Sequence, residues 1–122
     1  MEIKTVIAGS RKYNDYENAE KFIEECLKEL LPNNKIVIIS GGCKGADMLG
    51  IQYAANKGFD VIKYPAQWKK YGKAAGPVRN REMAQTADII ICFWDGNSSG
   101  TKSMIDYGKK AGKDVYIKYI TP

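Results

Sequence analysis

Residues 36–50 read Ile-Val-Ile-Ile-Ser-Gly-Gly-Cys-Lys-Gly-Ala-Asp-Met-Leu-Gly, the pattern of a buried strand that passes through a glycine turn directly into a helix. The unbroken branched apolar run at 36–39 is typical of a strand covered on both faces, as in a parallel sheet. Gly41 and Gly42 let the backbone come close to a ligand, and the free N–H groups of a helix's first turn attract anions. The stretch therefore predicts a turn that binds phosphate.

The rest of the chain continues this alternation of strands and helices. Short apolar runs predict strands at residues 3–8, 35–40, 59–64, 87–94 and 115–120, and helical apolar spacing predicts helices at 15–31, 44–57, 77–86 and 100–111. Residues 65–76 break the pattern and are expected to form a long loop. The order predicts an α/β fold, a Rossmann-like open parallel sheet of about five strands with helices on both faces.

Composition limits the classes of protein to which the chain can belong. Its 122 residues are 44% hydrophobic, which predicts a single domain over residues 1–122. No apolar run approaches the ~20 residues of a membrane-spanning helix, and the first residues lack a signal-peptide pattern, so we expect a cytoplasmic protein with no membrane contact.

Histidine is absent and the three cysteines are widely spaced, which excludes Ser-His and Cys-His catalytic pairs and a histidine-ligated zinc. We expect neither a metal nor a cofactor. The formal net charge of +5 suits an anionic ligand or a nucleic acid and does not decide between them.

Four polar or glycine-rich segments follow the predicted strands, at residues 9–11, 40–42, 65–76 and 95–101. Because ligands of open α/β sheets bind beyond the carboxyl ends of the strands, these segments should meet in one cleft. Their convergence is the main sequence argument for a binding site.

Two of these segments lead from a strand into a helix. The spacing Ser40-x-Gly42-x-x-Gly45 matches the dinucleotide fingerprint with serine in place of its first glycine, although a tight turn without ligand would look the same. The acid expected after the next strand of a dinucleotide fold is missing near Tyr64, and no Gly-Lys-Ser/Thr completes a P-loop. Residues 95–101 form a second candidate anion site or, alternatively, a well-capped helix start.

Several side chains near these turns suit a nucleotide, each with a structural alternative. Arg79 can bind a phosphate through two N–H groups of its guanidinium or make a surface ion pair. Asp47 can bind a ribose hydroxyl or stabilise its helix dipole, and Trp68 can stack on a base or plug the space under its loop. The candidate ligand-binding residues are Gly9, Ser10, Arg11, Ser40, Gly41, Gly42, Lys44, Gly45, Asp47, Trp68, Arg79, Asn80, Asp95, Gly96, Ser99, Gly100 and Thr101.

With these residues identified, the chain resembles the SLOG superfamily of Rossmann-like domains, and within it the YspA-type, cpYpsA-related SLOG group. The resemblance rests on five motifs in order, at residues 8–11, 40–47, 65–68, 76–83 and 93–101. It implies a cleft for a nucleotide or a nucleotide-derived ligand, such as an ADP-ribose-like molecule or a nucleotide sugar, and a homo-oligomer.

The chain is distantly similar to the Lonely Guy phosphoribohydrolases, which cleave nucleoside monophosphates at the glycosidic bond with an arginine and a glutamate. Arg79 or Arg81 matches the arginine, but Ser103 stands where the resemblance places the glutamate. A substitute carboxylate would be Glu82, Asp95 or Asp106, so the tentative catalytic set is Arg79, Glu82 and Asp95.

Three functions follow as hypotheses. The first is a sensor or module that binds a nucleotide-like small molecule, because the expected catalytic acid is missing. The second is an N-glycosidic hydrolase of nucleoside monophosphates. The third is a single-stranded DNA-binding domain, since DNA-processing relatives share the superfamily, although the scattered basic residues make nucleic acid the less favoured partner.

Overall fold

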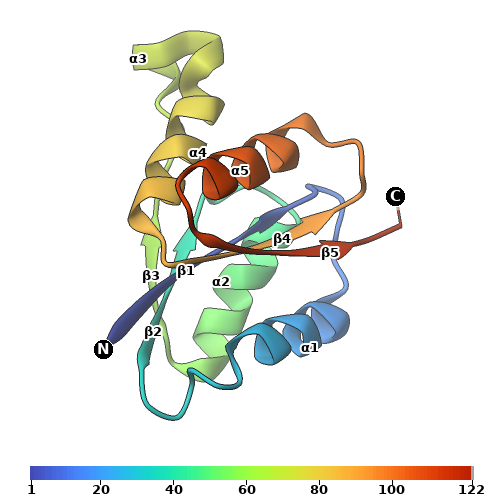
Figure 1. Ribbon diagram of the computed structural model, residues 1–122. Helices are drawn as coiled ribbons and strands as arrows, with labels where there is room; N and C mark the ends of the chain where they lie inside the picture. The colour runs from blue at the N-terminus through green and yellow to red at the C-terminus, as the bar shows by residue number, and fades with distance from the viewer. Residues whose placement is uncertain (122) are drawn as a thin grey trace.

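A computed structural model describes residues 1–121. Within this range the strands form one parallel sheet in the order β3-β2-β1-β4-β5 (Figure 1). The strands are β1 (Glu2–Gly9), β2 (Lys35–Ser40), β3 (Asp60–Lys63), β4 (Ile89–Trp94) and β5 (Asp114–Tyr119). The predicted Rossmann-like parallel sheet is therefore confirmed.

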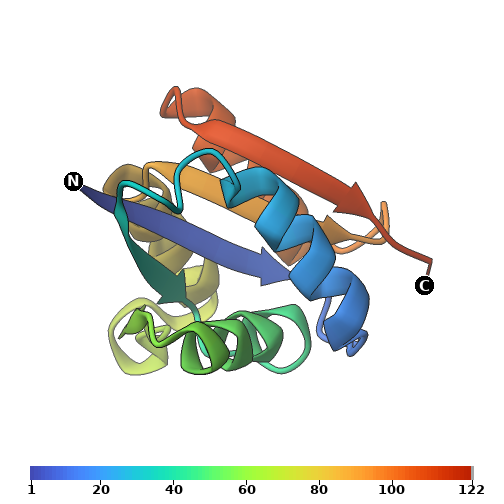
Figure 2. The same cartoon turned by 90° about the horizontal axis from the view of Figure 1, so that it is seen from below.

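Helices cover both faces of the sheet. They are α1 (Tyr16–Leu27), α2 (Ala46–Lys57), the short α3 (Trp68–Tyr71) and 3-10 turn η1 (Gly72–Ala74), α4 (Ala75–Thr86) and α5 (Ser99–Lys110). The views from the side and from below show α1 and α2 on one face and α4 and α5 on the other (Figures 1 and 2). No helix within residues 1–121 is both long enough and apolar enough to cross a membrane.

The two helical layers pack against alternate residues of the central strands, because successive strand side chains point to opposite faces. On β1, Ile7 joins the apolar cluster formed with α1 and α2, whereas Val6 and Ala8 join the cluster formed with α4 and α5. The double-sided burial expected for residues 36–39 is confirmed, since each is at most 3% exposed. These clusters hold the carboxyl ends of the strands together at one edge.

Residues 65–76 differ from the expected loop. They contain α3, η1 and the start of α4, so α4 begins at Ala75, two residues before Pro77. Proline is tolerated there because the first N–H groups of a helix have no intrahelical acceptor. The segment α3 carries no buried residue, so no apolar periodicity reveals it in the sequence.

Two glycines bring β1, β4 and the start of α2 into close contact. A Cβ on Gly9 would lie 2.3 Å from the Phe93 carbonyl oxygen, and one on Gly45 would lie 2.3 Å from the Ser10 carbonyl oxygen. Gly45 also has φ +77°, a value that L side chains rarely adopt, so α2 begins at Ala46 and not at residue 44 as predicted. This packing fixes the loop after β1 beside the end of β4.

Candidate functional site

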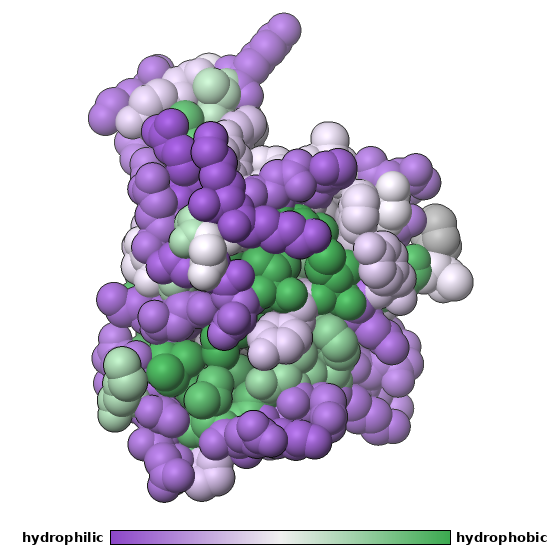
Figure 3. Space-filling view, viewed as in Figure 1, coloured by the Kyte–Doolittle hydropathy of each residue, from purple (hydrophilic) through white to green (hydrophobic). Residues whose placement is uncertain are grey.

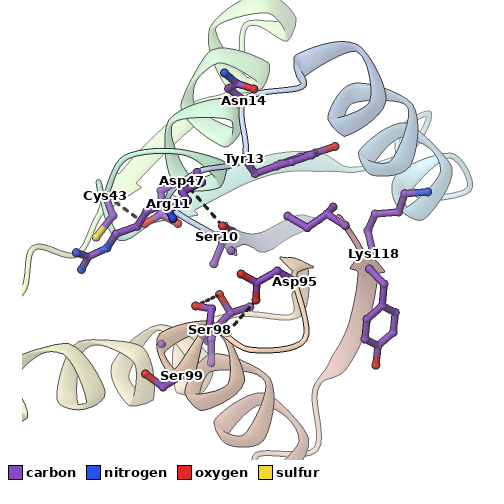
Figure 4. A pocket seen from close by; sticks show the side chains of 18 of the residues that line it. Ser10, Arg11, Tyr13, Asn14, Cys43, Asp47, Asp95, Ser98, Ser99 and Lys118 are labelled. Atoms are coloured by element: carbon purple, nitrogen blue, oxygen red, sulfur yellow. Dashed lines mark hydrogen bonds between the residues drawn. The ribbon is translucent and has the colours of Figure 1, made fainter. Parts of the chain in front are cut away.

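A cleft of about 1080 Å³ opens at the carboxyl edge of the sheet (Figure 4). It lies where β1 and β4 are neighbours and their connections leave to opposite faces, which is the topological switch point of an open α/β sheet. Its walls are the loop after β1, the first turn of α5, part of α4 and the end of β5. Of the four strand-end segments predicted to meet here, residues 9–11 and 95–101 contribute to the lining and residues 40–42 and 65–76 do not, whereas the end of β5 is an addition.

The first turn of α5 offers backbone donors to this cleft. The Asp95 carboxylate accepts the N–H groups of Asn97 and Ser98, both at 2.8 Å, and these bonds, that of Ser98 first, hold the pKa of Asp95 below its ordinary value. The next N–H groups, of Ser99, Gly100 and Thr101, have no hydrogen-bond acceptor within residues 1–121. All three residues line the cleft, so an anion there would meet open donors.

The turn between β2 and α2 is different, because three of its backbone donors are bonded within the chain. The Gly42 N–H donates to Ser40 Oγ at 3.1 Å, the Cys43 N–H donates to Asp47 Oδ2 at 3.1 Å, and the Ala46 N–H donates to the Ser10 carbonyl at 3.0 Å. The turn that suggested phosphate binding in the sequence thus has part of its donors occupied, and of residues 40–47 only Cys43 and Asp47 line the cleft.

Arg79 ties α4 to the ends of two strands. Its Nη1 donates to the carbonyls of Gly41 at 2.9 Å and Tyr64 at 3.3 Å, and its Nε donates to Asn80 Oδ1 at 3.1 Å. Asn80 in turn donates to the Gly100 carbonyl at 3.3 Å. Arg79 and Asn80 therefore line the cleft and also hold its walls in place.

Asp47 is a buried carboxylate in the wall of the cleft, only 6% exposed. Burial raises its pKa to about 6, against the opposing influence of the Cys43 N–H group and of the guanidinium groups of Arg79 and Arg11. Near neutral pH this group is an acceptor, and in mild acid a donor, for a ligand hydroxyl.

The structure brings together more than half of the residues that the sequence predicts for the site. Ten of them line the cleft: Gly9, Ser10, Arg11, Asp47, Arg79, Asn80, Asp95, Ser99, Gly100 and Thr101. The residues that do not line it are Ser40, Gly41, Gly42, Lys44, Gly45, Trp68, Glu82 and Gly96.

For two of these residues the structure corrects a role that the sequence suggested. On α4 the cleft-lining positions are Arg79, Asn80 and Met83, so helical geometry turns Glu82 away from the cleft. Trp68 is 57% exposed on α3, and it neither lines the cleft nor plugs a loop. Asp106 pairs with Lys102 at 2.8 Å on the exposed side of α5 and does not reach the cleft either.

Sequence reasoning missed several lining residues. Tyr13 stacks on Phe93 with ring centroids 5.1 Å apart and an interplanar angle of 21°, and Lys118 reaches the cleft from β5. In Figure 4, Tyr13 and Arg11 lie on one side of the cleft and Asp95, Ser98 and Ser99 on the other. Both missed side chains also lie close to the carboxyl ends of strands, so the argument that identified Arg11 as a candidate applies to them as well.

The part of the chain that the structure describes has no group of three or more Cys, Asp and Glu side chains placed to hold a metal ion. The polar groups of the cleft are instead suited to hydrogen bonds and charge pairing with an organic anion.

Comparisons with known proteins agree with this architecture. The Gene 61 protein of Mycobacterium phage D29 is 32% identical over 120 residues, which cover 92% of this chain and 93% of that protein. The structure of DNA processing protein A (DprA) from Streptococcus pneumoniae superposes with a TM-score of 0.73 at 21% identity.

That superposition covers 96% of this chain but 50% of DprA, so this chain spans about half the length of that protein, and the similarity shows the fold. A sequence model described as YspA, cpYpsA-related SLOG family matches residues 3–71, more than half of the chain, and confirms the resemblance read from the motifs. The chain therefore belongs to the YspA, cpYpsA-related SLOG family.

Proposed function

We propose that this protein is a binding module for a nucleotide or a nucleotide-derived ligand, held in the cleft between β1 and β4. The observation that carries the proposal is the group of open N–H donors of Ser99, Gly100 and Thr101 in the same cleft as Arg11 and Asp47. Helix N-termini and guanidinium groups bind phosphate, whereas a carboxylate binds ribose hydroxyls. One cleft thus offers partners for both polar parts of a nucleotide.

The size of the cleft favours a ligand larger than a monophosphate. Its volume of about 1080 Å³ lies just above the range typical of small-molecule sites, roughly 300–1,000 Å³. An ADP-ribose-like molecule or a nucleotide sugar would place a second sugar or phosphate toward Lys118 at the end of β5. The superfamily resemblance supports the same class of ligand.

Isothermal titration calorimetry against nucleoside monophosphates, diphosphates, ADP-ribose, nucleotide sugars and inorganic phosphate tests the proposal. We expect at least one nucleotide derivative to bind with a micromolar Kd and Arg11→Ala to weaken it about tenfold, the size of one charge-assisted contact. Lys109→Ala, an exposed change on α5 away from the cleft, should leave the affinity unchanged. Failure of the whole panel to bind below millimolar concentration would contradict the proposal.

A second candidate function is N-glycosidic hydrolysis of a nucleoside monophosphate. It is favoured by two carboxylates of the cleft whose pKa values are shifted apart, that of Asp47 upward by burial and that of Asp95 downward by backbone donors. Such a pair is typical of an acid and a base or charge stabiliser in glycosidic cleavage. Glu82 has no part in this version, because it does not line the cleft.

Release of free base, followed by chromatography, decides this second candidate. We expect Asp47→Asn and Asp95→Asn each to lower the rate at least a hundredfold, the usual contribution of a general acid or base, while a calorimetric binding signal remains. If concentrated protein releases no base from any common monophosphate that it binds, the binding module is the remaining function.

We also propose that the protein acts in the cytoplasm as a homo-oligomer. The observation behind the assembly is the edge strand β5, which carries Tyr116 and Tyr119, 40% and 65% exposed. Exposed aromatic residues on an unpaired strand edge are a common contact between copies. Light scattering after size exclusion should show a mass above 13.6 kDa, and Tyr116→Lys should reduce it toward the monomer.

A further inference from the structure

The net positive charge of the chain is accounted for by one segment. Residues 61–81 contain six basic side chains and no Asp or Glu. The chain has 19 basic and 14 acidic residues, so removing these six leaves 13 basic residues against 14 acidic ones elsewhere. The net charge of +5 therefore belongs to this segment, although the basic residues look scattered when the sequence is read as a whole.

Much of this charge sits on a projection from the body of the protein. We call residues 63–73, which hold Lys63, Lys69, Lys70 and Lys73, the basic arm; it comprises the end of β3, α3 and η1. Figure 1 shows α3 extending beyond the helical layers, and Figure 3 shows the corresponding surface as mostly hydrophilic. All four lysines are exposed, and none forms an ion pair with any described residue.

The arm also exposes aromatic surface among its lysines. Trp68 is 57% exposed, and Tyr71 lies with its ring centroid 5.1 Å from Lys70 Nζ. Neither α3 nor η1 contains a buried residue, so the arm has no core that requires a tryptophan. A large ring left in water between unpaired cations marks an interaction surface more than a structural contact.

We propose that the basic arm binds single-stranded nucleic acid, with phosphates on its lysines and an unpaired base stacked on Trp68. Lysines that follow the backbone and an aromatic ring that accepts any base are the two components of sequence-tolerant single-strand binding. Duplex DNA has no free base to stack. The arm residues do not line the cleft, so this surface is separate from the proposed nucleotide site.

The charge part of the proposal is tested with a fluorescently labelled single-stranded oligothymidine, followed by anisotropy as a function of salt. Lys69→Glu with Lys70→Glu should weaken binding about tenfold or more, and should flatten the dependence of log K on log salt by about 1.4, or 0.7 per lost phosphate contact. Lys109→Glu with Lys110→Glu is the matched control, since it makes the same charge change at an exposed pair on α5. This control variant should change the binding affinity less than about twofold, because its two lysines are not expected to contact a phosphate.

The stacking part is tested at Trp68. Trp68→Ala should weaken oligothymidine binding about tenfold and Trp68→Phe much less, because phenylalanine keeps an aromatic face. Oligothymidine should quench the tryptophan fluorescence of the wild-type protein and not that of Trp68→Ala, in which Trp94 is the remaining tryptophan. The denaturation midpoints of these variants should match the wild type, because the arm is exposed.

Four results would overturn the proposal. They are equal loss of binding in the two lysine-pair variants, duplex binding as tight as single-strand binding, competition by a mononucleotide, and binding of phosphatidylserine vesicles in place of oligothymidine. Any of the first three results would mean that oligothymidine binds outside the basic arm or binds without stacking on Trp68. The last result would mean that the arm binds membranes. Competition by a mononucleotide would place oligothymidine in the cleft, whereas the other three results do not depend on whether the cleft binds a nucleotide.

Discussion

The turns at residues 40–46 and 95–101 look alike in the sequence and differ in the fold. Both connect a buried strand to a helix, and both contain glycine, serine and an aspartate nearby. In the first turn, Ser40, Asp47 and the Ser10 carbonyl accept three backbone N–H groups, including that of Ala46, the first residue of α2. In the second turn, Asp95 accepts two N–H groups before the helix, and the donors of the first helical turn stay open to the cleft.

This difference shows that a glycine turn before a helix is not by itself an anion site. The first turn uses its glycines for close packing, since a Cβ on Gly45 would meet the backbone of the loop after β1. In the second turn, a Cβ on Gly100 would meet nothing within 4 Å, so this glycine is not needed for close packing. We infer that the first turn stabilises the fold and the second turn binds ligand.

The largest expected effect is on the first turn. Gly45→Ala should destabilise the protein by roughly 4 kcal/mol or prevent folding, because the new Cβ would lie 2.3 Å from a carbonyl oxygen at φ +77°. Gly42→Ala is the matched change, since φ is +74° there with nothing within 4 Å, and should lose only about 1 kcal/mol. Urea unfolding of both variants measures the difference. Equal losses would mean that close packing does not distinguish this turn.

The next effect is the pH dependence of stability, which should have opposite signs in the two turns. Asp47 has its pKa raised from 3.8 to about 6 in the folded protein, so the native state keeps a proton that the unfolded chain releases. Stability should therefore fall as pH rises from about 4 to about 6, by up to about 3 kcal/mol for a shift of this size. Asp95 has a lowered pKa, so its contribution is present above its unfolded pKa and is lost as pH falls.

Denaturation midpoints measured at intervals from pH 3 to pH 7 separate these contributions. The difference between wild type and Asp47→Asn should show the fall between about pH 4 and 6, and the difference between wild type and Asp95→Asn should show a loss in acid instead. If the denaturation midpoints of wild type and Asp47→Asn change in parallel with pH, burial does not raise the pKa of Asp47.

Sequence patterns predicted the fold well because the signals are local. The apolar run at residues 36–39 and the turn glycines Gly9 and Gly58 mark strand and helix ends through backbone physics that needs no distant partner. Residues 65–76 were expected to form a loop because α3 is short and exposed, so it leaves no periodicity. Element boundaries were less accurate, as at α1, which ends at Leu27 and not at residue 31.

The site was harder to predict because its chemistry depends on pairings across the sheet. Nothing local shows that Ala46 donates to Ser10, or that Arg79 is held by the carbonyls of Gly41 and Tyr64. Those contacts decide which donors remain for a ligand, and they follow from strand order and close glycine packing. Glu82 shows the same limit, since its place on α4 depends on how that helix is rotated about its axis.

The smallest effect concerns one backbone donor of the second turn. Ser99 is the first residue of α5, where proline is well tolerated, and Ser98 has φ −56° and ψ 118°, an extended conformation compatible with a following proline. Ser99→Pro should therefore leave the free energy of unfolding within about 0.5 kcal/mol. It should weaken nucleotide binding about tenfold, near the lower limit of the contribution of one hydrogen bond to a charged group.

The control is Ser99→Ala, which removes the hydroxyl and keeps the backbone N–H. If the α5 turn binds phosphate through its backbone, calorimetry should give Ser99→Ala nearly the wild-type affinity and Ser99→Pro the reduced one. Equal loss in both variants would assign the contact to the hydroxyl, and no loss in either would remove this turn from the site. Because the N–H group of Ala46, the first residue of α2, already donates to the Ser10 carbonyl, this pair of variants tests the difference between the two turns at a single atom.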